Sequence, residues 1–126
     1  MSEFDTMSIA ERKALLSAWV TAAKEHDMYT IVNVGTTVVS EAKELAKFAE
    51  DEGADAIASM APYYNRCGTV DSLLDWVMEI GAVVPKLPFF FYHIPGTTQT
   101  DFAMSDLLRM AEDAGFTQLT HQGGVK

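Results

Sequence analysis

The chain has 126 residues, of which 48% are hydrophobic and 21% charged, as in an ordinary globular domain and unlike a disordered or fibrous chain. The 9 basic and 18 acidic residues give a formal net charge of −9, and the basic residues are scattered singly apart from Arg12-Lys13. This charge pattern argues against nucleic acid or an anionic membrane surface as a partner, because no basic patch suits a row of phosphates.

The first predicted element is an amphipathic helix that begins after residue 8. Ser8 and Glu11 have the spacing of a capping box, which marks the start of a helix. The apolar residues that follow at helical intervals are Leu15, Leu16, Trp19, Val20 and Ala23.

Strands and helices then alternate. Residues 29–35, 54–62 and 87–95 are short apolar or β-branched runs that end in glycine or proline, so each predicts a buried strand. Residues 116–126 predict the approach to a fourth strand and its beginning. The helices between these strands are predicted to open at Ser40, Asp71 and Ser105, and the first and last of them to end at Gly53 and Gly115.

This alternation predicts a parallel sheet, because parallel neighbours need a long crossover connection. Two α/β architectures fit: an open doubly wound sheet and a (β/α)8 barrel. A whole barrel needs about 250 residues, so a barrel reading makes residues 1–126 one partial TIM-barrel domain with about half of the strands. A doubly wound nucleotide or flavin binder would need a glycine-rich phosphate loop, which "VGTT" (34–37) is not.

Candidate chemistry lies where the predicted strands end, because parallel α/β folds gather their reactive groups at the carboxyl ends of strands. Tyrosines in apolar strands usually pack in the core. Tyr92 stands out because Pro95 and Gly96 end its strand just beyond it, so its hydroxyl is placed for proton transfer. Lys126 follows the last strand, and a lysine desolvated in a barrel can lose its proton and attack a ketone.

The other reactive residues show no such pattern. Cys67 has no evident histidine partner, and a lone cysteine cannot form an internal disulfide. The three histidines, His26, His93 and His121, lack the spacing of metal ligands, so we predict no metal site. The chain also has neither a secretory signal pattern nor a bilayer-spanning apolar run, so we expect a cytoplasmic protein without a membrane partner.

Three segments, "EAKELAKFAEDEGADAIASMAPYYNR", "LPFFFYHIPG" and "GGVK", resemble the N-acetylneuraminate lyase and dihydrodipicolinate synthase superfamily of class I aldolases. The resemblance covers about residues 7–126 with the order of strands and helices intact. It implies a (β/α)8 barrel enzyme, without a cofactor, that forms homotetramers and cleaves a sugar acid to pyruvate. Within the superfamily, "FYHIP" and "MSIAERKALLSAWV" are more similar to the sialate lyases than to the dihydrodipicolinate synthases.

The resemblance also implies roles for individual residues. Lys126 matches the Schiff-base lysine, and Tyr92 matches the tyrosine that contacts the substrate carboxylate and shuttles a proton. Thr98 lies in the loop after that strand, where "GTTQT" departs from the usual pattern, and Tyr63 and Tyr64 match positions near the site or subunit contacts. If Tyr92 and Lys126 end neighbouring strands about 4.8 Å apart, their side chains can meet at the barrel mouth.

Other parts of the family pattern are missing from the sequence. Of the family's hydroxyl-bearing loop before the first helix, only Ser2-Glu3 matches, and the sugar-binding segment that follows the lysine is absent. We therefore expect a partial chain that lacks part of the catalytic machinery. The alternatives are another pyruvate-dependent aldolase, such as a dihydrodipicolinate synthase-like enzyme, and a non-catalytic truncated form.

Overall fold

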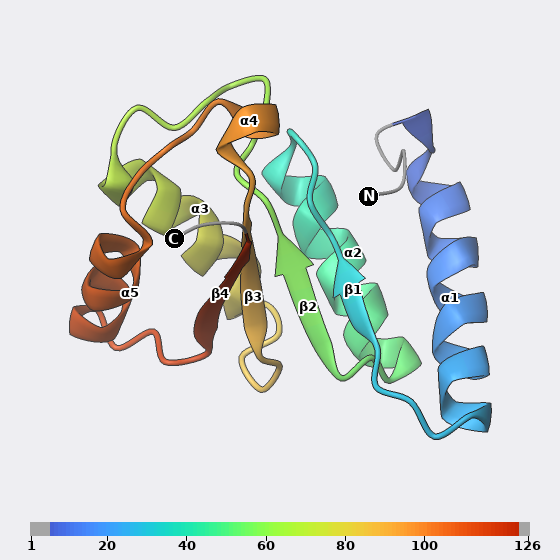
Figure 1. The fold of residues 1–126 in the computed structure, drawn as a ribbon. Coiled ribbons are helices and arrows are strands. Elements are labelled where there is room, and N and C mark those ends of the chain that lie inside the picture. Colours follow the sequence, from blue (N-terminus) through green and yellow to red (C-terminus); the bar gives the residue numbers. More distant parts are fainter. Residues whose placement is uncertain (1–5, 124–126) are drawn as a thin grey trace.

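The computed structural model describes residues 6–123, with side chains described as far as residue 120. Helices and strands alternate along the chain (Figure 1). The elements are α1 (Ile9–Glu25), β1 (Ile31–Asn33), α2 (Val39–Glu52), β2 (Ala56–Ser59), α3 (Val70–Ala82), β3 (Phe89–His93), α4 (Pro95–Thr98), α5 (Met104–Asp113) and β4 (Leu119–Gly123).

The four strands form one parallel sheet in the order β1-β2-β3-β4. Phe89 is in register with Ile57 on one side and with Leu119 on the other. The predicted parallel α/β sheet and its fourth strand are therefore confirmed. Sequential parallel strands joined by helices are the repeating unit of a (β/α)8 barrel, of which four strands are half.

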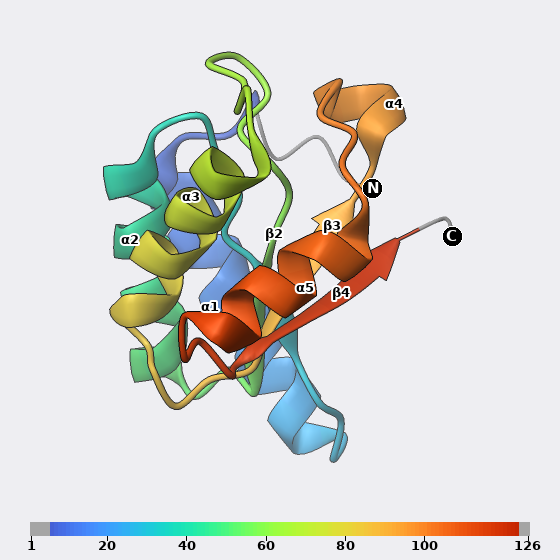
Figure 2. The ribbon, with the colours of Figure 1, turned by 90° about the vertical axis from the view of Figure 1, so that its left-hand side faces the viewer.

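The long helices α2, α3 and α5 pack on one face of this sheet (Figures 1 and 2). The strand sequence follows the same division. In β3, Phe89, Phe91 and His93 are buried, whereas Phe90 and Tyr92 are half-buried. Because successive side chains of a strand point to opposite faces, the first set lies on the helix side and the second on the other face. We call this second face the open face.

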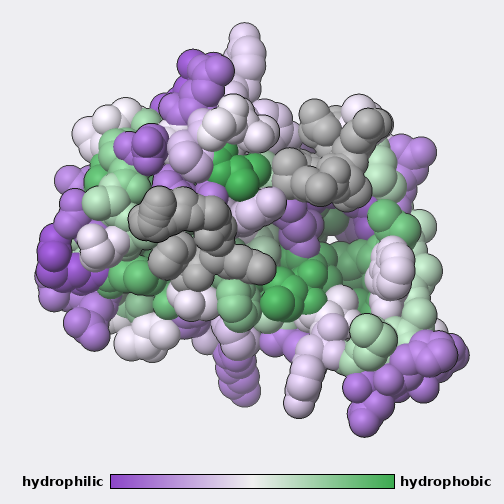
Figure 3. All heavy atoms as spheres, in the orientation of Figure 1, coloured by the Kyte–Doolittle hydropathy of each residue, from purple (hydrophilic) through white to green (hydrophobic). Residues whose placement is uncertain are grey.

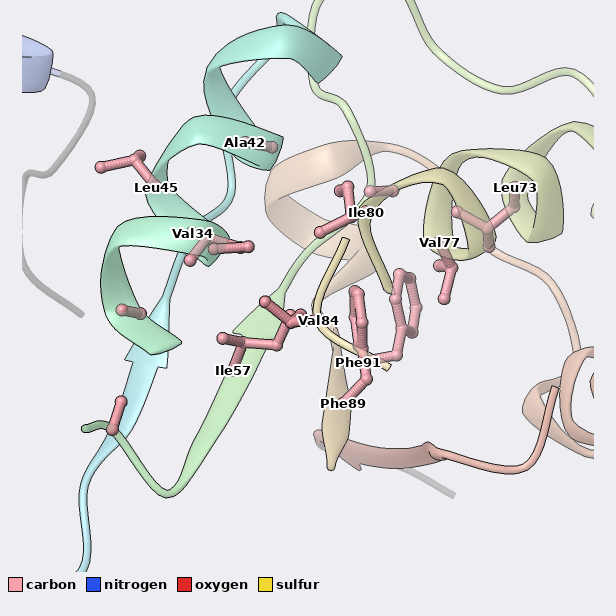
Figure 4. Close-up of a cluster of buried hydrophobic side chains, with 14 of the residues drawn as sticks. Val34, Ala42, Leu45, Ile57, Leu73, Val77, Ile80, Val84, Phe89 and Phe91 are labelled. Atoms are coloured by element: carbon pink, nitrogen blue, oxygen red, sulfur yellow. The ribbon is translucent and has the colours of Figure 1, made fainter. Parts of the chain in front are cut away.

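The core lies between the sheet and the helices. Phe89 and Phe91 from β3 and Ile57 from β2 meet Val77 and Ile80 from α3 (Figure 4). All five side chains are at most 1% exposed. Burial of a side chain of this size contributes about 1.5–3 kcal/mol, so this layer fixes which face of the sheet the helices cover.

The helix starts show where local sequence signals succeed and fail. The capping box of α1 is present as predicted: Ser8 Oγ accepts from the Glu11 amide and Glu11 Oε1 accepts from the Ser8 amide. These bonds hold the pKa of the Glu11 carboxyl below its usual value. Helix α2, however, begins at Val39 rather than being capped by Ser40, and Thr36 accepts from the Val38 amide in front of it.

Two further helix starts differ from the prediction. Helix α3 is capped by Thr69, whose Oγ1 accepts from the Ser72 amide, so Asp71 lies in the first turn. Helix α5 begins one residue before Ser105, without a side-chain cap. Gly53 ends α2 in the left-handed conformation, with φ of 93°, as expected for a glycine C-cap.

The apolar stripe predicted for α1 is only partly buried. Leu16 and Val20 are in the core, but Leu15 is 45% exposed and Trp19 is 64% exposed. Leu15 and Trp19 are exposed because α1 projects beyond β1, at the side of the sheet away from β2 (Figure 1).

Candidate functional site at the carboxyl edge of the sheet

The carboxyl ends of all four strands lie at one edge of the sheet, because the strands are parallel. Helix α4 lies at this edge, directly after β3 (Figure 1). It was not predicted from the sequence. Pro95 starts it, since the fixed backbone angle of proline suits the first helical position.

Tyr92 occupies the position that the sequence indicates for a catalytic group. It is the last but one residue of β3, half-buried, on the open face. Its register partner on the neighbouring strand is Gln122. The phenol therefore stands at the carboxyl edge, on the side of the sheet that no described helix covers.

Strand β4 leads from this point toward the predicted lysine. It is described as far as Gly123, the register partner of His93. Lys126 follows three residues later in the sequence and lies outside the described residues, as does Ser2-Glu3. The meeting of Tyr92 and Lys126 stays a prediction, and the parallel pairing of β3 with β4 is the geometry that it requires.

The tyrosine pair after β2 is divided between two environments. Tyr64 is 81% exposed in the loop between β2 and α3. Tyr63 is half-buried and lies close enough to the Arg12 guanidinium to raise the pKa of that group. Tyr64 is thus free to meet a ligand or another chain, whereas Tyr63 belongs to the interior of the carboxyl edge.

Thr98 ends helix α4 and is buried, with 2% of its surface exposed. Its Oγ1 donates to the Ile94 carbonyl at 3.3 Å and accepts from the Thr100 amide at 3.4 Å. These contacts brace α4 against the end of β3. A substrate contact through Thr98 stays a prediction, and the structure gives its hydroxyl local main-chain partners.

His93 lies on the helix side of β3, opposite Tyr92. Its Nε2 is 3.5 Å from Asp101 Oδ1, and its ring lies beside Phe91. The contact links the end of β3 to the segment between α4 and α5. His93 thus supports the strand end that carries Tyr92, without reaching the open face itself.

Arg12 is the main feature of this edge that the sequence analysis missed. It is only 8% exposed, and its guanidinium donates to the carbonyls of Asn33 and Gly35 at 2.9 Å each. Burial lowers its pKa, and nearby Tyr63 and Glu41 partly offset that effect. The arginine ties α1 to the carboxyl end of β1.

A signal for Arg12 was present in the sequence. Arg12 stands four residues after Ser8 and four before Leu16, so it lies on the buried side of α1. When basic residues are only counted, the pair Arg12-Lys13 looks like ordinary surface charge. The helical spacing separates them, since Lys13 is partly exposed and pairs with Glu44 on the surface of α2.

The remaining chemical candidates give no second site. Cys67 lies in the loop before α3, and burial raises the pKa of its thiol, which disfavours the reactive thiolate. Within residues 6–123 no cluster of three His, Cys, Asp or Glu side chains suits a metal ion. No helix in that part of the chain is both long and apolar enough to cross a membrane.

Comparison with known proteins agrees with this geometry. The model of the dihydrodipicolinate synthetase family matches residues 2–117. The chain belongs to this family. The aldolase superfamily expected from the sequence is thereby confirmed, and with it the lyase class of its members.

Named relatives of this family member include N-acetylneuraminate lyases. The orangutan enzyme (Pongo abelii) is 38% identical and the human enzyme 37% identical, each over 103 residues that cover 82% of this chain and 32% of the relative. The chain therefore spans about a third of the length of these relatives.

Solved structures of the family extend the match to the fold. N-acetylneuraminate lyase from Aliivibrio salmonicida superimposes with a TM-score of 0.86 at 28% identity, covering 94% of this chain and 38% of that one. The Proteus mirabilis enzyme gives a TM-score of 0.88 at 24% identity, covering 99% and 41%, and at that identity it supports the fold alone. The half-barrel architecture is confirmed by both.

Replacing Arg12 by methionine should destabilise the fold by about 2–4 kcal/mol, because the carbonyls of Gly35, which is buried, and Asn33, which is partly buried, lose charged donors. Lys13→Met is the matched control on the same helix, and the loss of its surface ion pair should cost about 1 kcal/mol or less. Urea unfolding of both variants measures the difference. Equal costs would show that Arg12 does not hold the edge.

The buried thiol predicts a shifted pH dependence for alkylation of Cys67. Because burial raises its pKa, the thiolate fraction in the folded chain is smaller than in the unfolded chain at the same pH. The rate of reaction with iodoacetamide rises with pH as the thiolate forms. The pH at the midpoint of this rise should be higher for the folded chain than for the same chain in denaturant. A folded midpoint at or below the unfolded one would contradict this environment.

Proposed function

We propose that the chain carries the Schiff-base centre of an aldolase of the N-acetylneuraminate lyase type, which cleaves N-acetylneuraminate to N-acetylmannosamine and pyruvate. One observation carries the proposal: Tyr92 stands on the open face at the carboxyl edge of β3, beside the strand that leads to Lys126. A proton-transfer group and an amine on neighbouring strand ends are the minimum for imine chemistry.

The residues would act in the following order. The Lys126 amine attacks the C2 ketone of the open-chain sugar acid and, with loss of water, forms a protonated imine. Tyr92 takes the proton of the C4 hydroxyl while the C3–C4 bond breaks. The electron pair of the C3–C4 bond moves into the protonated imine and gives an enamine. N-acetylmannosamine departs, C3 regains a proton, and water releases pyruvate from the lysine.

The choice of sugar acid rests on the sequence around β3 and on the relatives. "FYHIP" is similar to the sialate lyases, and the curated relatives are named N-acetylneuraminate lyase at 32–38% identity. The second candidate is a dihydrodipicolinate synthase-like reaction, in which the pyruvate enamine attacks a different aldehyde. It is supported by the similarity to a solved dihydrodipicolinate synthase, which superimposes with a TM-score of 0.78 at 29% identity. Both candidates pass through an imine between pyruvate and the lysine.

The environment of the Lys126 amine decides whether it can form an imine. A lysine in water keeps a pKa of about 10.4 and is almost fully protonated at neutral pH. Loss of the proton requires desolvation or a neighbouring cation. The proposal therefore requires that Lys126 be desolvated when pyruvate binds beside Tyr92. The cytoplasmic location and the homotetramer implied by the resemblance also remain part of this proposal.

Borohydride trapping tests the proposal. The purified chain is incubated with pyruvate and reduced, and the modified residue is located by peptide mass spectrometry. We expect the adduct on Lys126, no adduct in Lys126→Arg, and an unchanged adduct in the matched variant Lys86→Arg, which alters an exposed lysine far from β4 in sequence. Pyruvate attached to other lysines to the same extent would contradict the proposal.

The two candidate reactions are separated by the second substrate. If the trapping experiment labels Lys126, the unreduced chain is then assayed for turnover. Release of pyruvate from N-acetylneuraminate supports the lyase, and Tyr92→Phe should slow that release by about 10²–10⁴-fold, as expected when a proton-transfer group is removed. Turnover only of pyruvate with another aldehyde would favour the second candidate.

A further inference from the structure

The end of β3 that carries Tyr92 extends past the neighbouring strand β2. Ser59, the last residue of β2, is in register with Phe91. Tyr92 and His93 therefore extend beyond β2, and among the described residues their register partners belong to β4. A strand end that is paired on one side has fewer backbone hydrogen bonds to hold it than the middle of the strand. The position of Tyr92 thus depends on further contacts.

The segment after β3 folds back toward this strand end. The Ile94 carbonyl accepts from the Thr98 amide at 3.0 Å. The Pro95 carbonyl accepts from the Gln99 amide at 2.8 Å. Gln99 then ends α4 in the left-handed conformation, with φ of 58°, and this conformation turns the chain. Asp101 follows two residues after the turn.

His93 and Asp101 join the strand end to the returning segment on the helix side of the sheet. The His93 side chain is buried, and its Nε2 lies 3.5 Å from Asp101 Oδ1. The centre of its ring is 6.3 Å from that of Phe91. The Nε2–Oδ1 distance is longer than a usual hydrogen bond, but an imidazole with a proton on Nε2 is attracted to a carboxylate at this range. The contact therefore restrains the end of β3.

Tyr92 stands on the opposite face from this contact. Consecutive side chains of a strand point to opposite faces, so Tyr92 lies on the open face and His93 on the helix side. The open face is turned to the viewer in Figures 1 and 3, and hydrophobic side chains (green in Figure 3) are exposed on it. Because one planar peptide unit joins the two residues, a rotation of the strand end that moves the imidazole also moves the phenol.

We propose that His93 and Asp101 are positioning residues for Tyr92, since their contact on the helix side fixes the direction of the Tyr92 hydroxyl on the open face. The inference rests on the proposed function, in which Tyr92 takes a proton from the substrate. Proton transfer needs heavy atoms within about 2.6–3.2 Å, and a misplacement of about 1 Å can slow a reaction about 10²-fold. The pair should therefore affect cleavage of the carbon–carbon bond more than imine formation, which is carried out by Lys126.

The pair can be broken from its exposed side. The Asp101 side chain is 77% exposed, so Asp101→Asn removes the negative charge without leaving a cavity. Asp106→Asn is the matched control, because Asp106 is partly exposed and pairs with Arg109 on the surface of α5. At the buried partner, His93→Leu removes the donor, whereas His93→Gln retains an amide donor in place of Nε2.

Two steps are measured for each variant, namely borohydride trapping of pyruvate on Lys126 and release of pyruvate from N-acetylneuraminate. We expect Asp101→Asn and His93→Leu to slow the release on the order of ten-fold to 10²-fold, with trapping unchanged. His93→Gln should recover most of the loss, and Asp106→Asn should behave like the unmodified chain. An equal loss of both steps in Asp101→Asn would overturn the inference, because the pair would then only support folding. Release at the unmodified rate in that variant would also overturn it.

The NMR signal of the Tyr92 ring tests the inference without catalysis. The chain has four tyrosines, and Tyr92→Phe identifies the ¹³C-labelled ring signal that belongs to Tyr92. We expect this signal to shift or broaden in Asp101→Asn, although Asp101 contacts the other face of the sheet, and to stay in place in Asp106→Asn. If the unmodified chain neither labels Lys126 nor releases pyruvate, the proposed function fails, and the ring signal still decides whether the pair fixes Tyr92. The same Tyr92 signal in both variants would overturn the inference.

Discussion

A parallel sheet has two faces and two edges to satisfy, and in this chain the described helices satisfy one face. Phe89, Phe91 and Ile57 fill that face against α3. The layer sets the orientation of every strand, because a shift of one residue would turn all of the buried side chains outward. The side chains that point away from the helices, to the open face, then define the functional side of the molecule.

The sequence "PFFFYHIPG" shows how one strand serves both faces. Phe89, Phe91 and His93 point to the helices, and His93 secures the strand end through Asp101. Tyr92, between the last two, points to the open face at the carboxyl edge. The aromatic run thus contributes side chains both to the core and to the candidate site. Proline and glycine start α4 where the chain leaves the sheet. An aldolase needs this placement, because its lysine and tyrosine must act on one carbon skeleton.

Local and periodic signals predicted most of the fold. The capping box of α1, the glycine end of α2 and the parallel order of the strands follow from spacing alone. The errors arise where tertiary placement overrides a local pattern. Trp19 has the period of a core residue, but its part of α1 lies beyond the sheet. Ser40 is a good cap in isolation, but Thr36 already lies against the first turn of α2.

The candidate site was predictable in part for the same reason. Tyr92 could be found because a strand end can be read from proline and glycine. Arg12 was missed, since its partners are backbone carbonyls 21 and 23 residues away, and carbonyls leave no mark in a sequence. Helical spacing places Arg12 on the buried side of α1, but its role in holding the end of β1 is recognised only when α1 and β1 are seen side by side.

The central claim is that Tyr92 and Lys126 act together on the open face. A crystal structure of the borohydride-reduced pyruvate adduct tests it most directly. The account predicts continuous density from Lys126 Nζ to the pyruvate carbon, with the Tyr92 hydroxyl about 3 Å from an oxygen of the adduct. An adduct on the helix-covered face, or on a lysine remote from Tyr92, would contradict it.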